Sequence, residues 1–180
     1  AEVHQTKPED FDKAIANLKH AVEFKRSAKL KVTIGMQIVM IPPNLKTVPE
    51  LAKIGADIGV DYLALKPYVL HPDQKTMRWE GNYSLEEIEP IMQAAEKHSN
   101  KDFKVVARRE SFRKYFNRTY DHCLGLPFFA FVLSDGNVYT CGPYYENKEF
   151  AYGNIHEKTF KEIWASARRK DIQKFAATEL

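Results

Sequence analysis

The sequence predicts an α/β fold over residues 1 to 108, followed by a β-hairpin and a final helix. Segments of helical periodicity alternate there with nearly continuous apolar and β-branched runs, in the order α-β-α-β-α-β. The alternation stops after Arg109, and both cysteines of the chain, Cys123 and Cys141, lie beyond that point. The order is that of an open parallel sheet or of part of a (β/α) barrel, and composition does not separate the two.

The first helix and strand are marked by their ends. Thr6-Lys7-Pro8-Glu9 is a capping-box sequence, which predicts a helix that continues to about Ser27. Its apolar residues recur at helical spacing, at Phe11, Ile15, Leu18 and Val22. Residues 31–41, KVTIGMQIVMI, then predict a strand buried on both faces of a parallel sheet, and Pro42-Pro43 ends it.

The second helix and strand follow the same pattern. Thr47-Val48-Pro49-Glu50 is another capping box, and Gly59 is placed to take the left-handed position at the helix end. Residues 61–69, DYLALKPYV, predict the next strand. A helix between two such strands makes a right-handed βαβ unit the expected connection.

A third helix and strand complete the α/β part. Ser84-Leu85-Glu86-Glu87 is a capping box, and Pro90 lies deeper than the first turn, which predicts a kink or a later helix start. Residues 103–107 predict the third strand. The boundary with the C-terminal part is expected near residues 110 to 120.

The two cysteines flank a predicted β-hairpin. An apolar run over residues 127–133, a turn with Gly136 and a second extended run over residues 138–141 make up its sequence pattern. Cys123 precedes the first arm and Cys141 ends the second, so a hairpin in register brings both thiols toward the same end. Two soft ligands at one end of a hairpin can share a metal.

Helices are expected on both sides of this hairpin. A short helical piece covers about residues 111–116, and Thr159-Phe160-Lys161-Glu162 caps one final helix. The apolar side of the final helix is formed by Phe160, Ile163, Trp164, Ala167 and Phe175.

Composition and charge exclude several classes of protein. No run approaches the ~20 apolar residues of a membrane helix, and AEVHQTKPED has no hydrophobic signal region, so we expect a cytoplasmic protein that contacts no membrane. The net charge of +3 is interspersed, which does not indicate nucleic-acid binding. The densest basic runs, Arg108-Arg109 and Arg168-Arg169-Lys170, are interpreted as solvated ends of elements. Two cysteines are too few for a secreted disulfide scaffold.

A family resemblance lies in the C-terminal part. Cys123, twelve residues, Gly136, four residues and Cys141 resemble the opening of the auxiliary-cluster domain of radical SAM enzymes, called SPASM or, when shorter, twitch. Residues 152–155, YGNI, and 160–166, FKEIWAS, are similar to the segment that commonly follows that hairpin. The resemblance covers about residues 120 to 170, with a weaker match upstream.

The resemblance implies a metal centre in the second part of the chain. Residues 111–180 would be a SPASM/twitch-like domain, truncated, in which Cys123 and Cys141 ligate an auxiliary 4Fe-4S cluster. Four thiolates normally close such a cubane, so these two would be half of the ligand set. In the family, further cysteines usually follow the final helix, close to where this sequence ends at Leu180.

The resemblance also implies a role for the first part. Residues 1–110 would be the later half of a radical SAM partial (β/α) barrel. Ligands of parallel α/β folds lie at the C-terminal strand ends, so Met40, Asn44, Lys66 and Pro67 would line the adenosyl part of S-adenosylmethionine. Tyr68, Trp79 and Tyr83 would line one side of the substrate site. Each of these residues also has a purely structural interpretation: Lys66 can form a salt bridge, Asn44 can cap a turn, and the three aromatic side chains can simply pack.

The family's CxxxCxxC loop is absent, because no cysteine precedes Cys123. The chain alone is therefore expected to be the inactive C-terminal fragment of an oxidoreductase that abstracts hydrogen from a peptide, sugar or small metabolite. Its exposed first strand would pair with a second copy or with the missing N-terminal portion.

Three alternatives remain open at the level of sequence. The cysteines can be two buried free thiols in a non-catalytic α/β binding or assembly domain. They can also bind zinc together with His122 or His156, although His122 and its neighbour Cys123 would point to opposite sides of a strand. A hydrolytic enzyme is the weakest alternative, because no Ser/His/Asp or HExxH arrangement is present.

Overall fold

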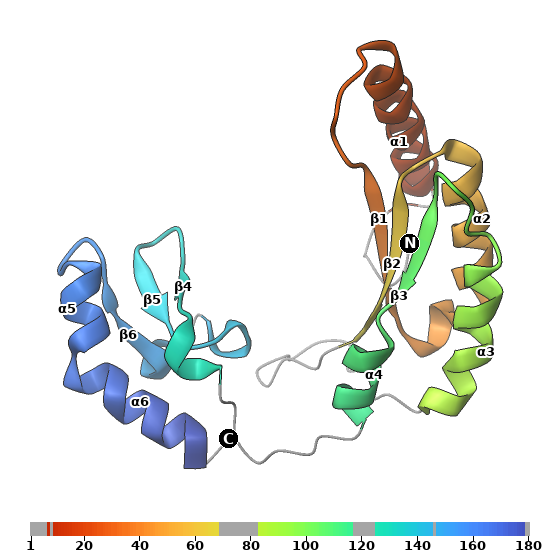
Figure 1. The fold of residues 1–180 in the computed structure, drawn as a ribbon. Coiled ribbons are helices and arrows are strands. Elements are labelled where there is room, and N and C mark those ends of the chain that lie inside the picture. Colours follow the sequence, from red (N-terminus) through yellow and green to blue (C-terminus); the bar gives the residue numbers. More distant parts are fainter. Residues whose placement is uncertain (1–6, 8, 69–82, 117–124, 146, 179–180) are drawn as a thin grey trace. The chain divides into compact units, whose positions relative to one another are not determined.

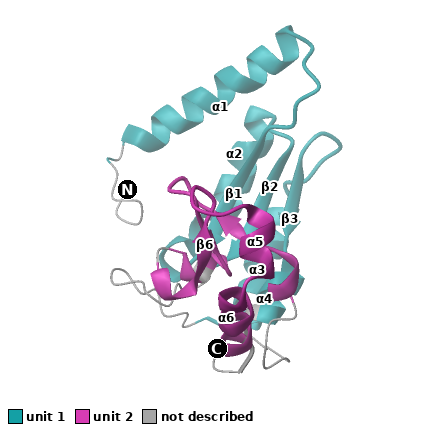
Figure 2. Ribbon diagram, turned by 90° about the vertical axis from the view of Figure 1, so that its left-hand side faces the viewer, with its two compact units in different colours: residues 1–69, 79–117 teal, residues 70–78, 118–180 magenta. Residues whose placement is uncertain are grey.

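The computed structural model describes residues 7, 9–68, 83–116, 125–145 and 147–178 (Figure 1). The chain divides into two compact units, one with residues 1–69 and 79–117 and the other with residues 70–78 and 118–180 (Figure 2). The fold is mixed α/β, as predicted, with a parallel sheet in the first unit and a small antiparallel sheet in the second. The predicted cap at Thr6, the loop with Trp79, and His122 with Cys123 lie outside the described residues.

A three-stranded parallel sheet organises the first unit. Its strands are β1 (Gly35–Met40), β2 (Tyr62–Pro67) and β3 (Lys104–Ala107), in the order β1-β2-β3. The connecting helices α2 (Val48–Ile58) and α3 (Leu85–Glu96) pack along each other on the same side of the sheet (Figure 1). The three described strands form an open sheet. That they belong to a partial (β/α) barrel therefore stays a prediction.

The two faces of the sheet differ in burial. Met36, Leu63 and Val105 are neighbours in register and face the core beneath the helices. On the opposite face Val39 and Val106 are each 38% exposed. The expectation that residues 31–41 form a strand buried on both faces is therefore wrong: the strand begins at Gly35, and exposure alternates along it because the described helices cover only one face.

Helix α1 (Glu9–Ser27) packs through part of its predicted apolar stripe. Ile15, Leu18 and Val22 contact the core, whereas Phe11 is 53% exposed, so the stripe does not extend to the first turn. An ion pair holds the other end, with Lys25 Nζ 2.6 Å from an oxygen of Asp61.

The Asp61 carboxylate joins three segments. Besides Lys25 it accepts a hydrogen bond of 2.6 Å from the backbone N–H of Ile34, just before β1. The hydrogen bonds from Lys25 and then from Ile34 lower the pKa of Asp61 below its ordinary value.

The ends of α2 and α3 test the predicted caps. Thr47 makes no side-chain cap, because residues Pro42–Thr47 form a 3-10 helix, η1, and the Thr47 hydroxyl donates to the Asn44 carbonyl at 2.8 Å. Gly59 takes the left-handed conformation with φ 84°, as predicted. Ser84 forms the predicted capping box, and α3 begins at Leu85 with Pro90 inside it, so the later start is wrong.

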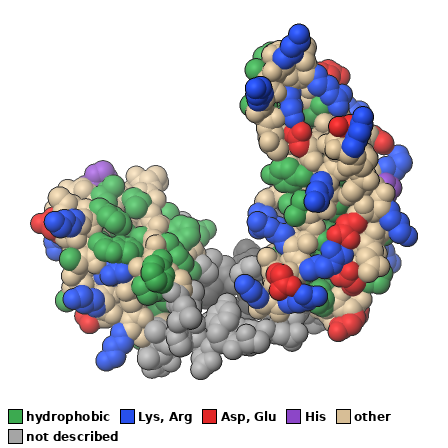
Figure 3. All heavy atoms as spheres, viewed as in Figure 1, with side chains coloured by type: hydrophobic (Ala, Val, Ile, Leu, Met, Phe, Trp, Pro, Cys, Tyr) green, Lys and Arg blue, Asp and Glu red, His purple; other side chains and the backbone are tan. Residues whose placement is uncertain are grey.

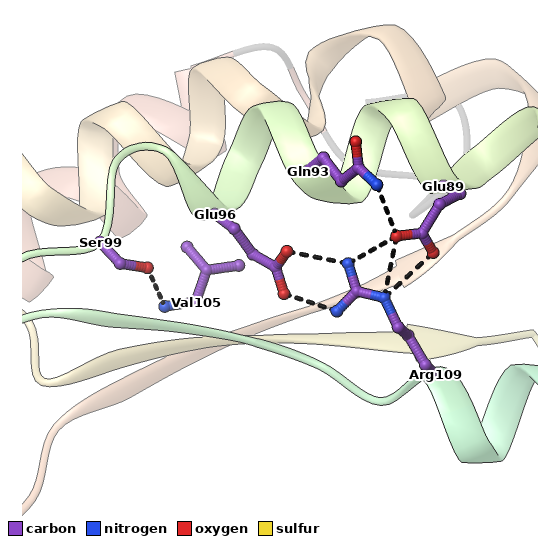
Figure 4. A network of polar contacts seen from close by, with 6 residues as sticks. All are labelled: Glu89, Gln93, Glu96, Ser99, Val105 and Arg109. Carbon is purple, nitrogen blue, oxygen red and sulfur yellow. Dashed lines mark hydrogen bonds and ion pairs between the residues drawn. The ribbon is translucent and has the colours of Figure 1, made fainter.

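Arg109 connects helix α4 (Arg109–Phe116) to α3. Its guanidinium donates to Glu89 and to Glu96, with the shortest contact 2.7 Å to a Glu96 oxygen (Figure 4). These hydrogen bonds raise the pKa of Arg109 and lower that of Glu89. The basic pair Arg108-Arg109 is therefore not simply a solvated end. Charges of both signs are interspersed over the face of the first unit seen in Figure 3.

The second unit contains the predicted hairpin. Strands β4 (Phe131–Val132) and β5 (Asn137–Tyr139) pair antiparallel, and Gly136 in the turn has φ 83°. The first arm is shorter than predicted, because residues Leu126–Phe128 form a 3-10 helix, η2. A third strand, β6 (Ala151–Asn154), pairs with β5 and was not predicted.

Two helices complete this unit where one was expected. Short 3-10 helices, η3 (Gly142–Tyr144) and η4 (Lys148–Phe150), connect β5 to β6. Thr159 forms the predicted capping box of α5 (Phe160–Ala165). The chain then becomes extended at Ser166, with ψ 152°, and α6 (Ala167–Thr178) starts in a new direction, so a single final helix is wrong.

The second unit has its own small core. Val138, Tyr152, Ile163 and Ile172 are buried together, one from each of β5, β6, α5 and α6. In the described part of the chain, no helix is long and apolar enough to cross a membrane.

Candidate functional site

Cys141 lies at the end of the hairpin, two residues beyond β5. Its side chain is half-buried, and its extended backbone (φ −154°, ψ 152°) starts η3, whose Tyr144 N–H donates to the Cys141 carbonyl at 3.1 Å. The ring of Phe131 is in van der Waals range of the Gly142 position. Cys141 therefore lies at a tight turn, and the glycine that follows it faces an aromatic ring.

The hairpin register places the chain after Cys123 at this same end. Phe131 pairs with Tyr139 and Val132 with Val138, so the residues before β4 and those after β5 leave the hairpin together. This agrees with the predicted hairpin, whereas the position of Cys123 itself lies outside the described residues. Leu126, three residues after Cys123, is buried and starts η2.

A chain of hydrogen bonds runs between these two segments. Thr140, the neighbour of Cys141, is fully buried, and its Oγ1 accepts from the Tyr152 hydroxyl at 2.8 Å. Gln173 Nε2 donates to that Tyr152 hydroxyl at 3.3 Å and to the Leu126 carbonyl at 3.0 Å. Helix α6 therefore contacts the Leu126 segment directly and is connected to Thr140 through Tyr152 of β6.

Arg169 adds a second contact from α6. Its guanidinium carbon lies 3.7 Å from the ring centroid of Trp164, and its Nη atoms donate to the carbonyls of Trp164 and Pro127, both at 3.1 Å. The neighbouring Arg168 donates to the Ala151 carbonyl at 2.7 Å. The interpretation of this basic run as a solvated end is therefore wrong for both arginines.

These contacts give a physical reason for the motif FKEIWAS. Ile163 is buried in the core, Trp164 stacks on Phe160 and on Arg169, and the Ser166 hydroxyl accepts from the Arg169 N–H at 3.1 Å. Sequence reasoning found the motif but missed Thr140, Tyr152, Arg169 and Gln173 as partners. The Arg169 and Gln173 spacing of four, which places both on one helix face, was the available signal.

Of the two histidines considered as zinc ligands, His156 does not lie near Cys141. A side chain at Gly136, in the hairpin turn, would overlap the ring of His156. His156 therefore lies at the turn, and Cys141 lies at the opposite end of the hairpin. Within the ranges that the structure describes, no three His, Cys, Asp or Glu side chains gather as a metal site.

At the strand ends of the first unit, the four predicted cofactor residues lie near one another. Met40 is a register neighbour of Pro67, and Asn44 Nδ2 donates to the carbonyl of Val39, the neighbour of Lys66, at 2.8 Å. These residues differ, however, in whether their side chains are available to contact a ligand.

Met40 and Asn44 have structural partners. The Met40 side chain is fully buried beneath the helices, and its carbonyl accepts from the Tyr83 hydroxyl at 2.8 Å. Asn44 Oδ1 accepts from the Ile41 N–H at 3.0 Å, which braces the turn. Lys66 is half-buried on the sheet face away from the helices, and its side chain makes no ion pair among the described residues.

The donor chemistry fits an iron-sulfur centre in part. Cysteine thiolates are the usual ligands of such clusters, and a half-buried thiol at a tight turn is a suitable donor. The sequence holds two cysteines, so its own thiolates could supply half of a four-thiolate set.

Comparison with known proteins identifies the same region. Residues 123–180 match the family model of SPASM, an iron-sulfur cluster-binding domain. The match begins at Cys123 and includes the hairpin, Cys141 and both final helices. No curated protein matches the chain.

Proposed function

Because residues 123–180 carry a SPASM-type iron-sulfur cluster-binding domain, we propose that Cys123 and Cys141 ligate an auxiliary 4Fe-4S cluster in a radical SAM enzyme. The observation that carries this proposal is the half-buried Cys141 at the end of the hairpin, together with a register in which the residues just before β4 leave the hairpin at that same end. When bound, the cluster would accept electrons or hold the substrate.

The chain's own residues would place and tune that centre. Cys141 would hold it at the start of η3, and the aromatic ring of Phe131 beside Gly142 would limit access of water to this side. Such surroundings affect the potential of iron-sulfur sites through burial and hydrogen bonding. The other two ligands would be supplied by groups other than these two cysteines.

For the first unit we propose a segment of a (β/α) barrel that contributes to S-adenosylmethionine binding. Supporting observations are the sequential strand order and the helices on one face, which leave Val39 and Val106 exposed on the other. Met40, Asn44, Lys66 and Pro67 would form the cofactor edge, with Lys66 as its charged side chain.

Anaerobic reconstitution of the full chain tests the cluster proposal. The protein is incubated with iron, sulfide and dithiothreitol, whose thiols complete the coordination, beside the double variant Cys123→Ala, Cys141→Ala. Uptake of iron and sulfide with visible absorption in the wild type alone is expected. Equal iron in both proteins would overturn the proposal.

Two controls separate the zinc alternative. His156→Ala should take up as much cluster as the wild type, because His156 lies at the other end of the hairpin. Stoichiometric zinc in protein purified without added metal, lost in the cysteine variant, would favour a zinc site instead.

A second candidate function is a non-catalytic assembly module. The observation that favours it is β1, which forms one edge of the sheet in the described part of the chain. Pairing of this edge with a second copy, or with the N-terminal portion of a parent enzyme, would satisfy its backbone groups. Sedimentation over a concentration series tests self-pairing, and a monomer throughout would exclude the second copy.

A further inference from the structure

We propose that Gln173 and Arg169 are positioning residues that hold the two cysteine-bearing segments at a fixed spacing, with Tyr152 and Thr140 completing the connection. This inference rests on the proposed cluster function and deepens it. It implies that α6 limits how far apart the two thiols lie before any cluster is bound.

The amide of Gln173 is placed between the two segments. A carboxamide nitrogen has two N–H donors, and in Gln173 one acceptor belongs to each side. The Leu126 carbonyl, 3.0 Å away, lies on the Cys123 side, and the Tyr152 hydroxyl, 3.3 Å away, leads to the Cys141 side. The Tyr152 hydroxyl passes the connection on to Thr140 Oγ1 at 2.8 Å.

Arg169 strengthens the hold on the Cys123 side. It lies one helical turn before Gln173, and its Nη2 donates to the Pro127 carbonyl at 3.1 Å, next to the carbonyl that Gln173 contacts. Its stacking on Trp164 fixes the guanidinium. The short helix η2 leaves carbonyls without partners inside the helix, and two of them accept from α6 side chains, which restrains its position.

The residues that form this connection are buried. Thr140 is 0% exposed, Tyr152 3% and Leu126 5%, so water does not readily replace a lost bond. Thr140 is covalently joined to Cys141, and three residues of chain, at most about 11 Å, separate Leu126 from Cys123. A fixed distance between Leu126 and Thr140 therefore limits the distance between the two thiols.

The test uses the full chain with Tyr152→Phe and with Gln173→Leu, each of which breaks the connection. Two controls each delete one hydrogen bond elsewhere. Asn147→Ala removes the bond from the Glu149 N–H at 3.0 Å within the second unit, and Tyr83→Phe removes a buried hydroxyl bond of 2.8 Å in the first. Far-ultraviolet circular dichroism checks that every variant is folded.

The first measurement needs no cluster. Cys123 and Cys141 are the chain's only cysteines, so a thiol-specific nitroxide labels these two positions alone. Dipolar broadening of the electron paramagnetic resonance spectrum should be clear in the wild type and both controls, and weaker in Tyr152→Phe and Gln173→Leu. Broadening that is absent from the wild type, or equal in all five proteins, would overturn the inference.

The second measurement uses the reconstituted cluster. Its loss to an iron chelator, followed by visible absorption, should be about tenfold faster in the two test variants, the factor expected for one buried hydrogen bond. A wild type that takes up no cluster contradicts the proposed function, while the label spectra still decide whether α6 positions the thiols. Equal loss rates in test and control variants would contradict the inference alone.

Discussion

Replacing Arg109 with Met should destabilise the first unit by about 2 kcal/mol. The guanidinium makes five N–H to oxygen contacts of 2.7 to 3.0 Å with Glu89 and Glu96. The three side chains are 29% to 33% exposed, so each pair is expected to contribute about 1 kcal/mol rather than the larger value of a buried pair. Methionine keeps most of the stem and removes the charge.

Urea unfolding followed by circular dichroism measures this loss, and amide hydrogen exchange locates it. Exchange should accelerate in peptides from residues 85–116 and stay unchanged in those from 137–178, which belong to the other unit. Adding Glu96→Gln to Arg109→Met should recover part of the stability. Once Arg109 is gone, Glu89 and Glu96 repel each other, and the substitution removes one of these two negative charges. A loss below about 0.5 kcal/mol, or equal acceleration in both units, would refute the reasoning.

The same network predicts a dependence on pH. The hydrogen bonds from Arg109 lower the pKa of Glu89 in the folded state, so this carboxylate contributes stability above its unfolded pKa of about 4.3. That contribution is lost as the pH falls through the lowered folded pKa. The stability difference between wild type and Arg109→Met should therefore be full at pH 7 and shrink below about pH 4.

Three further substitutions test the fold. Asp61→Asn should weaken the attachment of α1 at pH 7, with a smaller effect in acid because the pKa of Asp61 is lowered by Lys25; limited proteolysis near Lys25 measures it. Gly136→Ala should cost about 2 kcal/mol in urea unfolding, since its φ is 83° and the new methyl would overlap His156; no change would contradict the turn geometry. Ser84→Ala should cost about 1 kcal/mol by removing the cap of α3, and an unchanged midpoint would count against that cap.

Local patterns predicted most of the elements because their causes are local. The capping boxes at Ser84 and Thr159 and the left-handed Gly59 depend on neighbours within four residues, and the structure confirms them. The prediction that Thr47 caps α2 is wrong. Pro42 and the residues after it form a 3-10 helix, in which the Thr47 hydroxyl donates to the Asn44 carbonyl instead. A capping-box sequence alone does not report what precedes it.

Long-range partners explain the misread arginines. A basic pair shows only charge, whereas Arg109 finds carboxylates 13 and 20 residues away and Arg169 a carbonyl 42 residues away. Glu89 and Glu96 are seven residues apart, which places them on one face of α3 and was a readable signal. For Arg169 the four-residue spacing to Gln173 indicated a shared helix face, but it did not identify the Pro127 carbonyl as the partner.

The strand order narrows which predicted residues are suited to bind a ligand. Because β1, β2 and β3 follow one another across the sheet, there is no reversal of order and hence no switch-point crevice among the described strands. Ligand access is then expected from the face that the helices leave open, at the C-terminal strand ends. Lys66 lies on that face, whereas Met40 faces the helices and its carbonyl accepts from Tyr83. We therefore expect Lys66, rather than Met40, to contribute a side chain to any ligand bound at this edge.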